Sequence, residues 1–326
     1  MIFEEQVSRR PNQYPWTTEF VEAMHNGFWT DKEFNFNSDK HDFLVTLSTQ
    51  ERDVIVRTLS AISQIEVAVK TFWGKLGDNL PHPYIADMGY VMANVEVIHN
   101  NAYERLLHVL GLDDVFEANL KLPCIGNRVK YLKKYCKGAY KDDKKQFVYA
   151  LILFTLFVEN VSLFSQFYVI NWFARNKNVL KDTDQQVKYT RNEENLHALV
   201  GIKLVNVIRE EYPELFDAEL EERIKQEARV AFESEAVIID WIMAEYKQDG
   251  LTPEVLKEFV KKRLNESLVQ IGYSEIFVTN PALVKETKWF YEELLGNNMA
   301  DFFKTRPTEY SKKSQSFNVD DMFADI

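Results

Sequence analysis

Glycine and proline are scarce in this sequence, whose 326 residues include 11 Gly and 9 Pro. Because these residues mark turns, their scarcity argues against a fold of many short strands and favours long helices. Apolar residues are plentiful in contrast: 46% of the chain is hydrophobic, with 23 Phe and 15 Tyr. That is enough material for one large buried core or for two ordinary domains.

Cysteine is also in short supply, and acidic residues outnumber basic ones. Cys124 and Cys136 make neither a disulfide framework nor a zinc site, so we expect free thiols in a reducing cytosol. The net charge of -11, without a basic stripe in the sequence, argues against a nucleic-acid binder. The N-terminal residues MIFEEQVSRRPNQYPW lack the apolar region of a secretory signal, which agrees with a cytoplasmic protein.

One stretch is long and apolar enough to span a bilayer, YALILFTLFVENVSLFSQFYVINWF, which runs from Tyr149 to Phe173. Glu159, Asn160 and Gln166 interrupt it, and a carboxylate in the middle of a membrane is costly. The centre of a large helical bundle also needs a helix that is apolar on all sides. We therefore expect a core helix and no membrane association.

Helical patterns cover most of the chain, and strand signals are weak throughout. Ser48 and Glu51 resemble a capping box at the start of one long helix, and Gly111 is placed to end another. We predict helices over about 17–26, 48–76, 85–110, 126–136, 144–176, 183–212, 215–247, 253–271 and 281–295. Residues 304–326 are polar and lack helical periodicity, so we expect a helical domain over 1–303 and a flexible tail.

Two of the predicted helices each carry a Glu-x-x-His pair, and two more each carry a carboxylate within apolar sequence. Positions i and i+3 share a helix face, so each pair directs a carboxylate and an imidazole toward one point. This donor set matches the general description of ferritin-like dimetal carboxylate proteins. The six residues are Glu66, Glu96, His99, Glu159, Glu194 and His197.

Electrostatics explains why such a set needs metal. Four buried carboxylates without partners would be prohibitively costly, and two divalent cations would neutralise them. Oxygen donors with one imidazole per metal suit iron or manganese, whereas zinc favours fewer ligands and has no redox chemistry. The other histidines fall outside the pattern and are expected on the surface or in ordinary packing: His25, His41, His82 and His108.

Around these ligands the sequence closely resembles the small subunit of class I ribonucleotide reductases over almost its whole length. Tyr103 in EVIHNNAY, Trp29 in GFWTDKEFNF, Tyr310 and the C-terminal FNVDDMFADI carry the resemblance beyond the ligands. It implies an all-α ferritin-like bundle, a homodimer and the radical-initiating subunit of ribonucleoside-diphosphate reductase. It also implies one metal held by Glu66, Glu96 and His99 and another held by Glu159, Glu194 and His197, with bridging carboxylates shared.

The resemblance further implies a role for each of these features. Tyr103 stands where di-iron members carry the radical tyrosine, and Trp29 resembles the tryptophan on the radical-transfer route. Tyr310 resembles the tail tyrosine that relays the radical to the large subunit, where a cysteine is oxidised and ribonucleotides are reduced. Without the resemblance, Tyr103 and Trp29 would be interpreted as core aromatics. The tail would dock on the large subunit through Phe317, Val319, Asp320, Asp321, Met322, Phe323 and Ile326.

Three departures bear on the metal. Glu66 stands where di-iron tyrosyl members have Asp, and Glu193 stands where they commonly have an Asp that links the tryptophan to the metal site. Thr190 lies near the position of an apolar residue that packs on their tyrosine. A first-position Glu resembles the manganese-using subgroups, and the presence of Tyr103 argues against the Mn/Fe one. We favour a dimanganese centre, with Fe/Fe plus a Tyr103 radical, or Mn/Fe, as alternatives.

Two other functions use similar residues. A ferritin-like oxidase or desaturase acting on a lipid or small molecule shares the ligands, but it needs neither Trp29 nor a docking tail. An iron-storage or purely structural bundle needs no radical route, and storage proteins are usually shorter.

Overall fold

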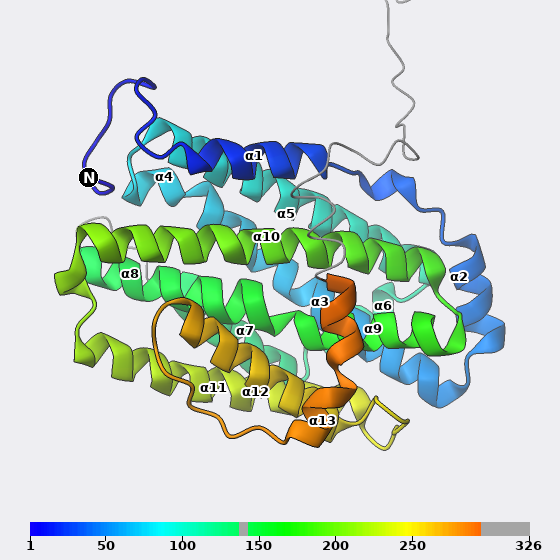
Figure 1. Cartoon of the computed structure of the whole chain (residues 1–326). Helices are drawn as coiled ribbons and strands as arrows, with labels where there is room; N and C mark the ends of the chain where they lie inside the picture. Colours follow the sequence, from blue (N-terminus) through cyan, green and yellow to red (C-terminus); the bar gives the residue numbers. More distant parts are fainter. Residues whose placement is uncertain (137–142, 295–326) are drawn as a thin grey trace, which may run out of the picture.

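The protein consists of helices packed side by side (Figure 1). The computed structural model describes residues 1–136 and 143–294, apart from the side chains of 66–69 and 131–136. Those ranges contain helices and no β-strand, which confirms the all-α prediction. The α-helices are α1 Trp16–Asn26, α2 Asn37–His41, α3 Thr49–Gly74, α4 Leu76–Asn79, α5 Pro83–Leu110, α6 Asp113–Asn119, α7 Pro123–Cys136, α8 Lys144–Leu153, α9 Phe164–Lys177, α10 Lys181–Glu211, α11 Ala218–Met243, α12 Pro253–Gln270 and α13 Pro281–Glu286.

Short 3₁₀ and π segments complete the chain. The 3₁₀ segments are η1 Asp31–Glu33 and η4 Pro213–Leu215, and the π segments are η2 Asp42–Thr46 and η3 Phe154–Ser162. Segment η3 lies between α8 and α9, so residues 144–177 run through the protein as α8, η3 and α9 in succession.

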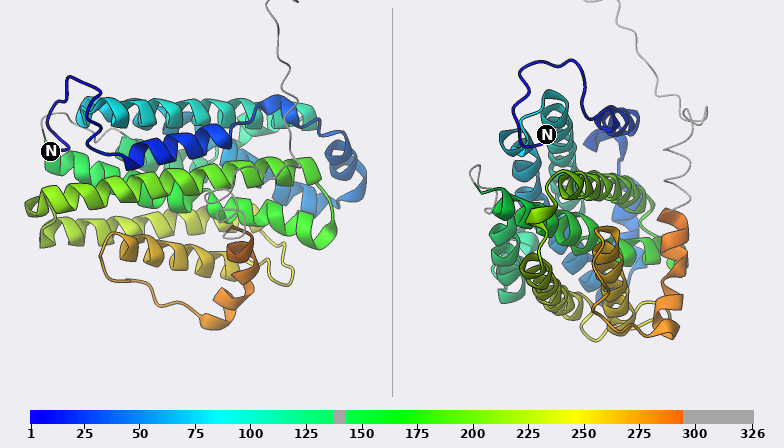
Figure 2. Two further views of the ribbon diagram at one scale, coloured as in Figure 1. Left: turned by 45° about the horizontal axis from the view of Figure 1, so that its top comes forward. Right: turned by 60° about the vertical axis from the view of Figure 1, so that its left-hand side comes forward.

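The centre of the bundle is formed by α3, α5, η3 and α10. Helix α3 packs on α5, while α10 packs on η3, α8, α9 and α5. Helices α11 and α12 pack on each other and cover another side, where α11 contacts α3 and α7 and α12 contacts η3 (Figure 2). The four predicted ligand-bearing segments are therefore the central ones.

Two helix boundaries follow directly from local chemistry. The Ser48 side chain accepts a hydrogen bond from the backbone N–H of Glu51, and the Glu51 carboxylate accepts one from the N–H of Ser48, so the predicted capping box is confirmed. Helix α5 begins at Pro83 and ends at Leu110, and the Gly111 that follows it has a φ of 71°. Glycine adopts this left-handed conformation without the steric cost of a side chain.

The run Lys144–Lys177 is long and apolar enough to cross a membrane, but its most apolar part is completely buried inside the protein. Its hydrophobicity is that of a central core helix. The sequence predicted one uninterrupted α-helix over 144–176, and this is corrected by the structure. The π segment Phe154–Ser162 occupies the middle of the run, and Glu159 lies within it.

Other differences concern short elements and boundaries. Helices α2, α4 and α6 were not predicted, because elements of four to seven residues leave little periodicity to detect. The helix predicted over 281–295 is divided near Thr287 into α13 and a helical segment over 288–294. The predicted domain boundary at residue 304 lies outside the described residues.

Candidate metal centre

Four buried side chains converge at the centre of the bundle. Glu96 comes from α5, Glu159 from η3, and Glu194 and His197 from α10. Each offers one ligand atom, and these atoms all lie within 4.8 Å of one another. All four side chains are almost completely buried, so water does not compensate their charge.

Four atoms of this cluster are buried without a hydrogen-bond partner: Oε1 of Glu96, Oε2 of Glu159, and Nδ1 and Nε2 of His197. The His197 Nδ1 nevertheless lies 2.8 Å from that oxygen of Glu96 and 3.7 Å from that of Glu159. Buried polar atoms are nearly always hydrogen-bonded, so close atoms that do not bond to one another need another partner. Oxygen and imidazole donors that converge in this way fit divalent iron or manganese.

His99 joins the cluster from α5. Its Nδ1 lies 3.1 Å from Oε1 of Glu194 and 3.3 Å from Oε2 of Glu96, whereas its Nε2 lies 2.8 Å from Oε2 of Glu193. The ring therefore presents Nδ1 to the cluster and donates Nε2–H to Glu193. A carboxylate behind a metal-binding histidine sets the tautomer and the orientation of the ring.

The same Glu193 oxygen accepts a second hydrogen bond, of 2.7 Å, from Nε1 of Trp29. Trp29 lies in the segment between α1 and η1, is buried, and has its ring centroid 6.2 Å from that of His99. A continuous hydrogen-bonded chain thus runs from Trp29 through Glu193 to His99. The structure brings these three predicted residues together.

Trp73, on α3, was not predicted from the sequence. Its Nε1 donates a 2.5 Å hydrogen bond to Oε1 of Glu159, and its ring centroid lies 6.3 Å from that of His197. The available signal was spacing, because Trp73 follows Glu66 by seven residues and so shares its helix face.

Tyr103 is buried on α5, and its hydroxyl donates a 3.3 Å hydrogen bond to Oγ1 of Thr190. The Thr190 hydroxyl in turn donates to the carbonyl of Gln186 at 3.2 Å. The residue singled out as a departure near the tyrosine is therefore its direct hydrogen-bond partner.

Burial and crowding of carboxylates dominate the protonation of the cluster. Burial, with repulsion from Glu194, raises the pKa of Glu159 well above its ordinary value. Burial alone would raise the pKa of Glu194, but the close side chains of Glu159, His197 and His99 outweigh it and lower that pKa. Burial likewise opposes the charged form of His197, yet the surrounding carboxylates prevail and raise its pKa. Without metal, this cluster retains protons.

Several predicted residues cannot be placed in this site. Glu66 lies on α3, but its side chain is outside those described. Tyr310 and the docking residues Phe317, Val319, Asp320, Asp321, Met322, Phe323 and Ile326 are also outside the described residues.

The histidines left out of the pattern lie elsewhere. His25, His41 and His108 are exposed, while the ring nitrogens of buried His82 lie near the Gln6 side chain and the Met1 carbonyl.

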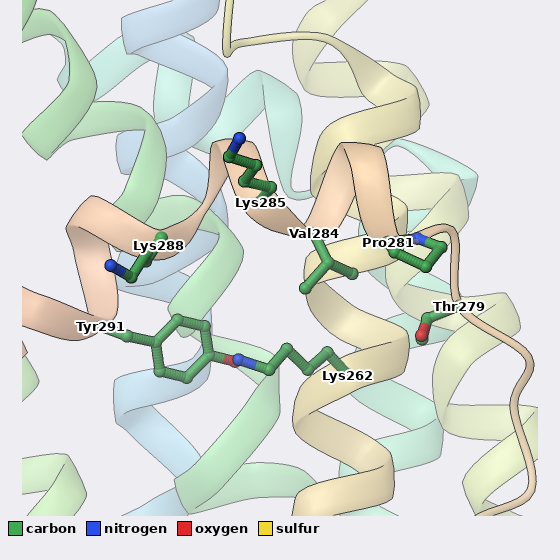
Figure 3. Close-up of a pocket in the computed structure, with 7 residues that line it drawn as sticks. All are labelled: Lys262, Thr279, Pro281, Val284, Lys285, Lys288 and Tyr291. Atoms are coloured by element: carbon green, nitrogen blue, oxygen red, sulfur yellow. The ribbon is translucent and has the colours of Figure 1, made fainter.

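A surface cavity of about 340 Å³ lies beside α12 and α13, away from this cluster (Figure 3). Lys262, Lys285 and Lys288 line it, but two of these cations are already engaged. Lys262 lies over the Tyr291 ring, 3.8 Å from its centroid, and pairs with Glu266, while Lys288 pairs with Glu292. No residue of the carboxylate–imidazole cluster lines this cavity.

Fold and donor set together define a ferritin-like helical protein with a candidate metal-binding cluster of carboxylates and imidazole at its centre. Residues 7–283 match the family model described as ribonucleotide reductase, small chain. The chain belongs to this family and is a class I ribonucleotide reductase small subunit, so the expectation from sequence is confirmed at this level.

Curated relatives agree over nearly the full chain. The subunit beta of ribonucleoside-diphosphate reductase from Chlamydia pneumoniae is 27% identical over 92% of this chain and 88% of its own. The corresponding protein from Halalkalibacterium halodurans is 23% identical over 95% and 90%.

Solved structures show the same fold. The ribonucleotide reductase R2 subunit from Clostridium botulinum gives a TM-score of 0.76 at 20% identity, covering 86% of this chain and 89% of that one. Dimanganese(II)-NrdF from Streptococcus sanguinis gives 0.71 at 14% identity, covering 87% and 99%. An R2-like ligand-binding oxidase with a Mn/Fe cofactor gives 0.70 at 17% identity, covering 82% and 96%.

Proposed function

We propose that this chain stores an oxidising equivalent at a dimanganese centre and delivers it to a cysteine of the large subunit, where ribonucleoside diphosphates are reduced. Glu66, Glu96, Glu159, Glu194, His99 and His197 are the proposed ligands. When bound, the two ions would supply the oxidising equivalent after reaction with an oxygen species.

The observation that carries this proposal is the hydrogen-bonded chain from Trp29 through Glu193 to His99. An oxidase that acts on a molecule bound at its own metal site does not need such a chain. A buried indole can lose an electron while its Nε1–H proton moves toward the carboxylate that accepts its hydrogen bond. In this proposal Glu193 orients His99 and holds the proton of Trp29 when charge moves along the route.

Manganese is proposed from residues close to the site. Glu66 in place of Asp is typical of the manganese-using subgroups, and the hydrogen bond from Tyr103 to Thr190 adds a polar contact where tyrosyl members have an apolar residue. In this proposal Tyr103 is a spectator and the metals hold the oxidant. Fe/Fe with a Tyr103 radical and Mn/Fe remain the alternatives to be tested.

The partner contacts are proposed from the family. Two copies of this chain would form a homodimer, and residues 304–326 would dock on the large subunit through the apolar and acidic residues at the end of the tail. Tyr310 would then relay the radical between the subunits.

Reconstitution tests the function. The chain is loaded with Mn(II), activated with a reduced oxygen species and mixed with the large subunit, and deoxynucleotide formation is measured. The proposal predicts formation that depends on metal and is lost in Glu159→Ala. A metal-loaded protein that supports no nucleotide reduction, and instead oxidises a bound fatty acid, would favour the oxidase or desaturase.

A further inference from the structure

Two buried arginines lie against the π segment that carries Glu159. Arg263, on α12, donates from Nε to the carbonyl of Asn160 at 2.7 Å and from Nη2 to Oδ1 of the same residue at 2.6 Å. Asn160 donates in turn to Oγ of Ser267 at 2.6 Å. Two nitrogens of the Arg263 guanidinium therefore form a fork that contacts Asn160, the residue directly after Glu159.

Arg128, on α7, contacts the end of the same segment. Its guanidinium donates to the carbonyl of Ser162 and, at 3.0 Å, to Oε1 of Gln166, while Glu235 on α11 balances its charge. Both arginines are almost fully buried, and α7 and α12 both pack on η3. Guanidinium groups from two different helices therefore reach backbone carbonyls of one segment.

These contacts lie where the helical hydrogen-bond ladder changes. Helix α9 starts after Leu163, whose carbonyl accepts hydrogen bonds from the N–H groups of both Gln166 and Phe167. The Ser162 hydroxyl donates back to the carbonyl of Phe157 at 2.6 Å. Carbonyls at such a junction lose their regular helical donors, and in a dry core they need other partners.

We propose that Arg263 is a positioning residue for Glu159: by holding the Asn160 carbonyl and side chain, it keeps η3 in the π register that aims the Glu159 carboxylate at the metal site. A return to α-helical register would rotate Glu159 relative to α10 and away from His197. Trp73 fixes the Glu159 side chain directly, because its indole N–H donates a hydrogen bond to the carboxylate. Arg128 supports the register at Ser162.

The inference rests on Glu159 being a metal ligand, as proposed above. Its test compares Arg263→Met with Arg263→Lys, which keeps the charge but loses the two-point fork. The control is Arg209→Met, because Arg209 also donates to a backbone carbonyl, that of Ile271, and lies over the rings of Phe216 and Tyr273. Arg209 is 12 residues beyond His197 on α10, about 18 Å along the helix.

Mn(II) binding is measured on each full-length protein from the EPR signal of the free ion. Hydrogen exchange of the 154–166 peptide is measured alongside, and thermal melting confirms folding. We expect Arg263→Met to bind one of two Mn(II) ions about tenfold more weakly or worse, with faster exchange in this peptide. Arg263→Lys should fall between it and the wild type, and Arg209→Met should match the wild type in both readouts.

Wild-type binding of both ions and unchanged exchange in Arg263→Met would overturn the inference. So would equal weakening in Arg209→Met, because the effect would then be general. If Arg263→Met does not fold, Arg263→Lys decides by the same two measurements. A wild-type protein that binds no Mn(II) would contradict the proposed function itself and, with it, the role of Arg263.

Discussion

Trp29 and Glu193 are separated by 164 positions in the chain, yet the indole Nε1–H of one donates a 2.7 Å hydrogen bond to Oε2 of the other. The same oxygen lies 2.8 Å from Nε2 of His99. One carboxylate oxygen therefore contacts two buried side chains, the indole of Trp29 and the imidazole of the proposed ligand His99. This shared acceptor gives the clearest residue-level test of the radical route.

Glu193→Leu removes the acceptor for both donors. We expect metal affinity to fall about 10- to 100-fold because His99 loses its orienting partner. When metal is supplied in excess to restore occupancy, nucleotide reduction with the large subunit should still fall by about 100-fold. Glu193→Asp is the matched control and should retain more activity than Leu, since it keeps a carboxylate. Full activity in Glu193→Leu would exclude this route.

Metal binding should release protons. The pKa of Glu159 and that of His197 are both raised in the metal-free cluster, so both groups hold their protons to higher pH than an ordinary Glu or His side chain. Ligands must lose these protons to bind metal, and affinity should therefore weaken as pH falls, up to about tenfold per pH unit for each proton released. Calorimetry of Mn(II) binding in buffers of different ionisation enthalpy counts the protons. Mn(II) binding that releases no protons and does not weaken as pH falls would contradict the pKa directions.

Tyr103→Phe separates the two kinds of oxidant. The variant loses the hydroxyl that bonds to Thr190, at a cost to folding of about 1 kcal/mol, since Thr190 keeps its bond to the Gln186 carbonyl. If the metals hold the oxidising equivalent, the Mn-loaded variant should keep at least about half of the wild-type activity. Complete loss of activity in a correctly metallated Phe variant would make Tyr103 the working radical.

The Arg128–Glu235 pair should be important for stability. Both side chains are almost fully buried, with 3.2 Å between Arg128 Nε and Glu235 Oε1. Glu235→Gln leaves a buried cation without its counter-charge, which costs about 3 to 5 kcal/mol. Glu254→Gln, which breaks an exposed pair with Lys247, should change the unfolding free energy by less than about 1 kcal/mol. Urea unfolding measures the free energy of unfolding of both variants. Equal losses in the two variants would contradict a special contribution of the buried Arg128–Glu235 pair to stability.

Helix content and the ligand-bearing helices could be predicted from the sequence because the information is local. The Glu-x-x-His spacing places Glu96 with His99 on one face, and Ser48 and Gly111 mark helix ends within a few residues of themselves. Trp29 and Glu193 could be related only through resemblance to a family, since no local pattern connects positions so far apart.

The π segment could not be predicted, because its causes lie on other helices. Residues 154–162 are apolar enough for any helical register, and the groups that satisfy the junction come from Arg263 on α12 and Arg128 on α7. From sequence alone, an arginine in a helix is expected on the surface, because arginine side chains are mostly exposed in folded proteins. Similarly, only the folded bundle shows that Trp73 reaches Glu159.

Whether manganese holds the oxidising equivalent can be tested on a single sample. The protein is purified from cells supplied with both manganese and iron, activated, and analysed for metal content and EPR spectrum together. We predict two Mn per chain and a manganese multiline signal without a tyrosyl signal. Stoichiometric iron with a tyrosyl radical signal would contradict a dimanganese oxidant and make Tyr103 the oxidant.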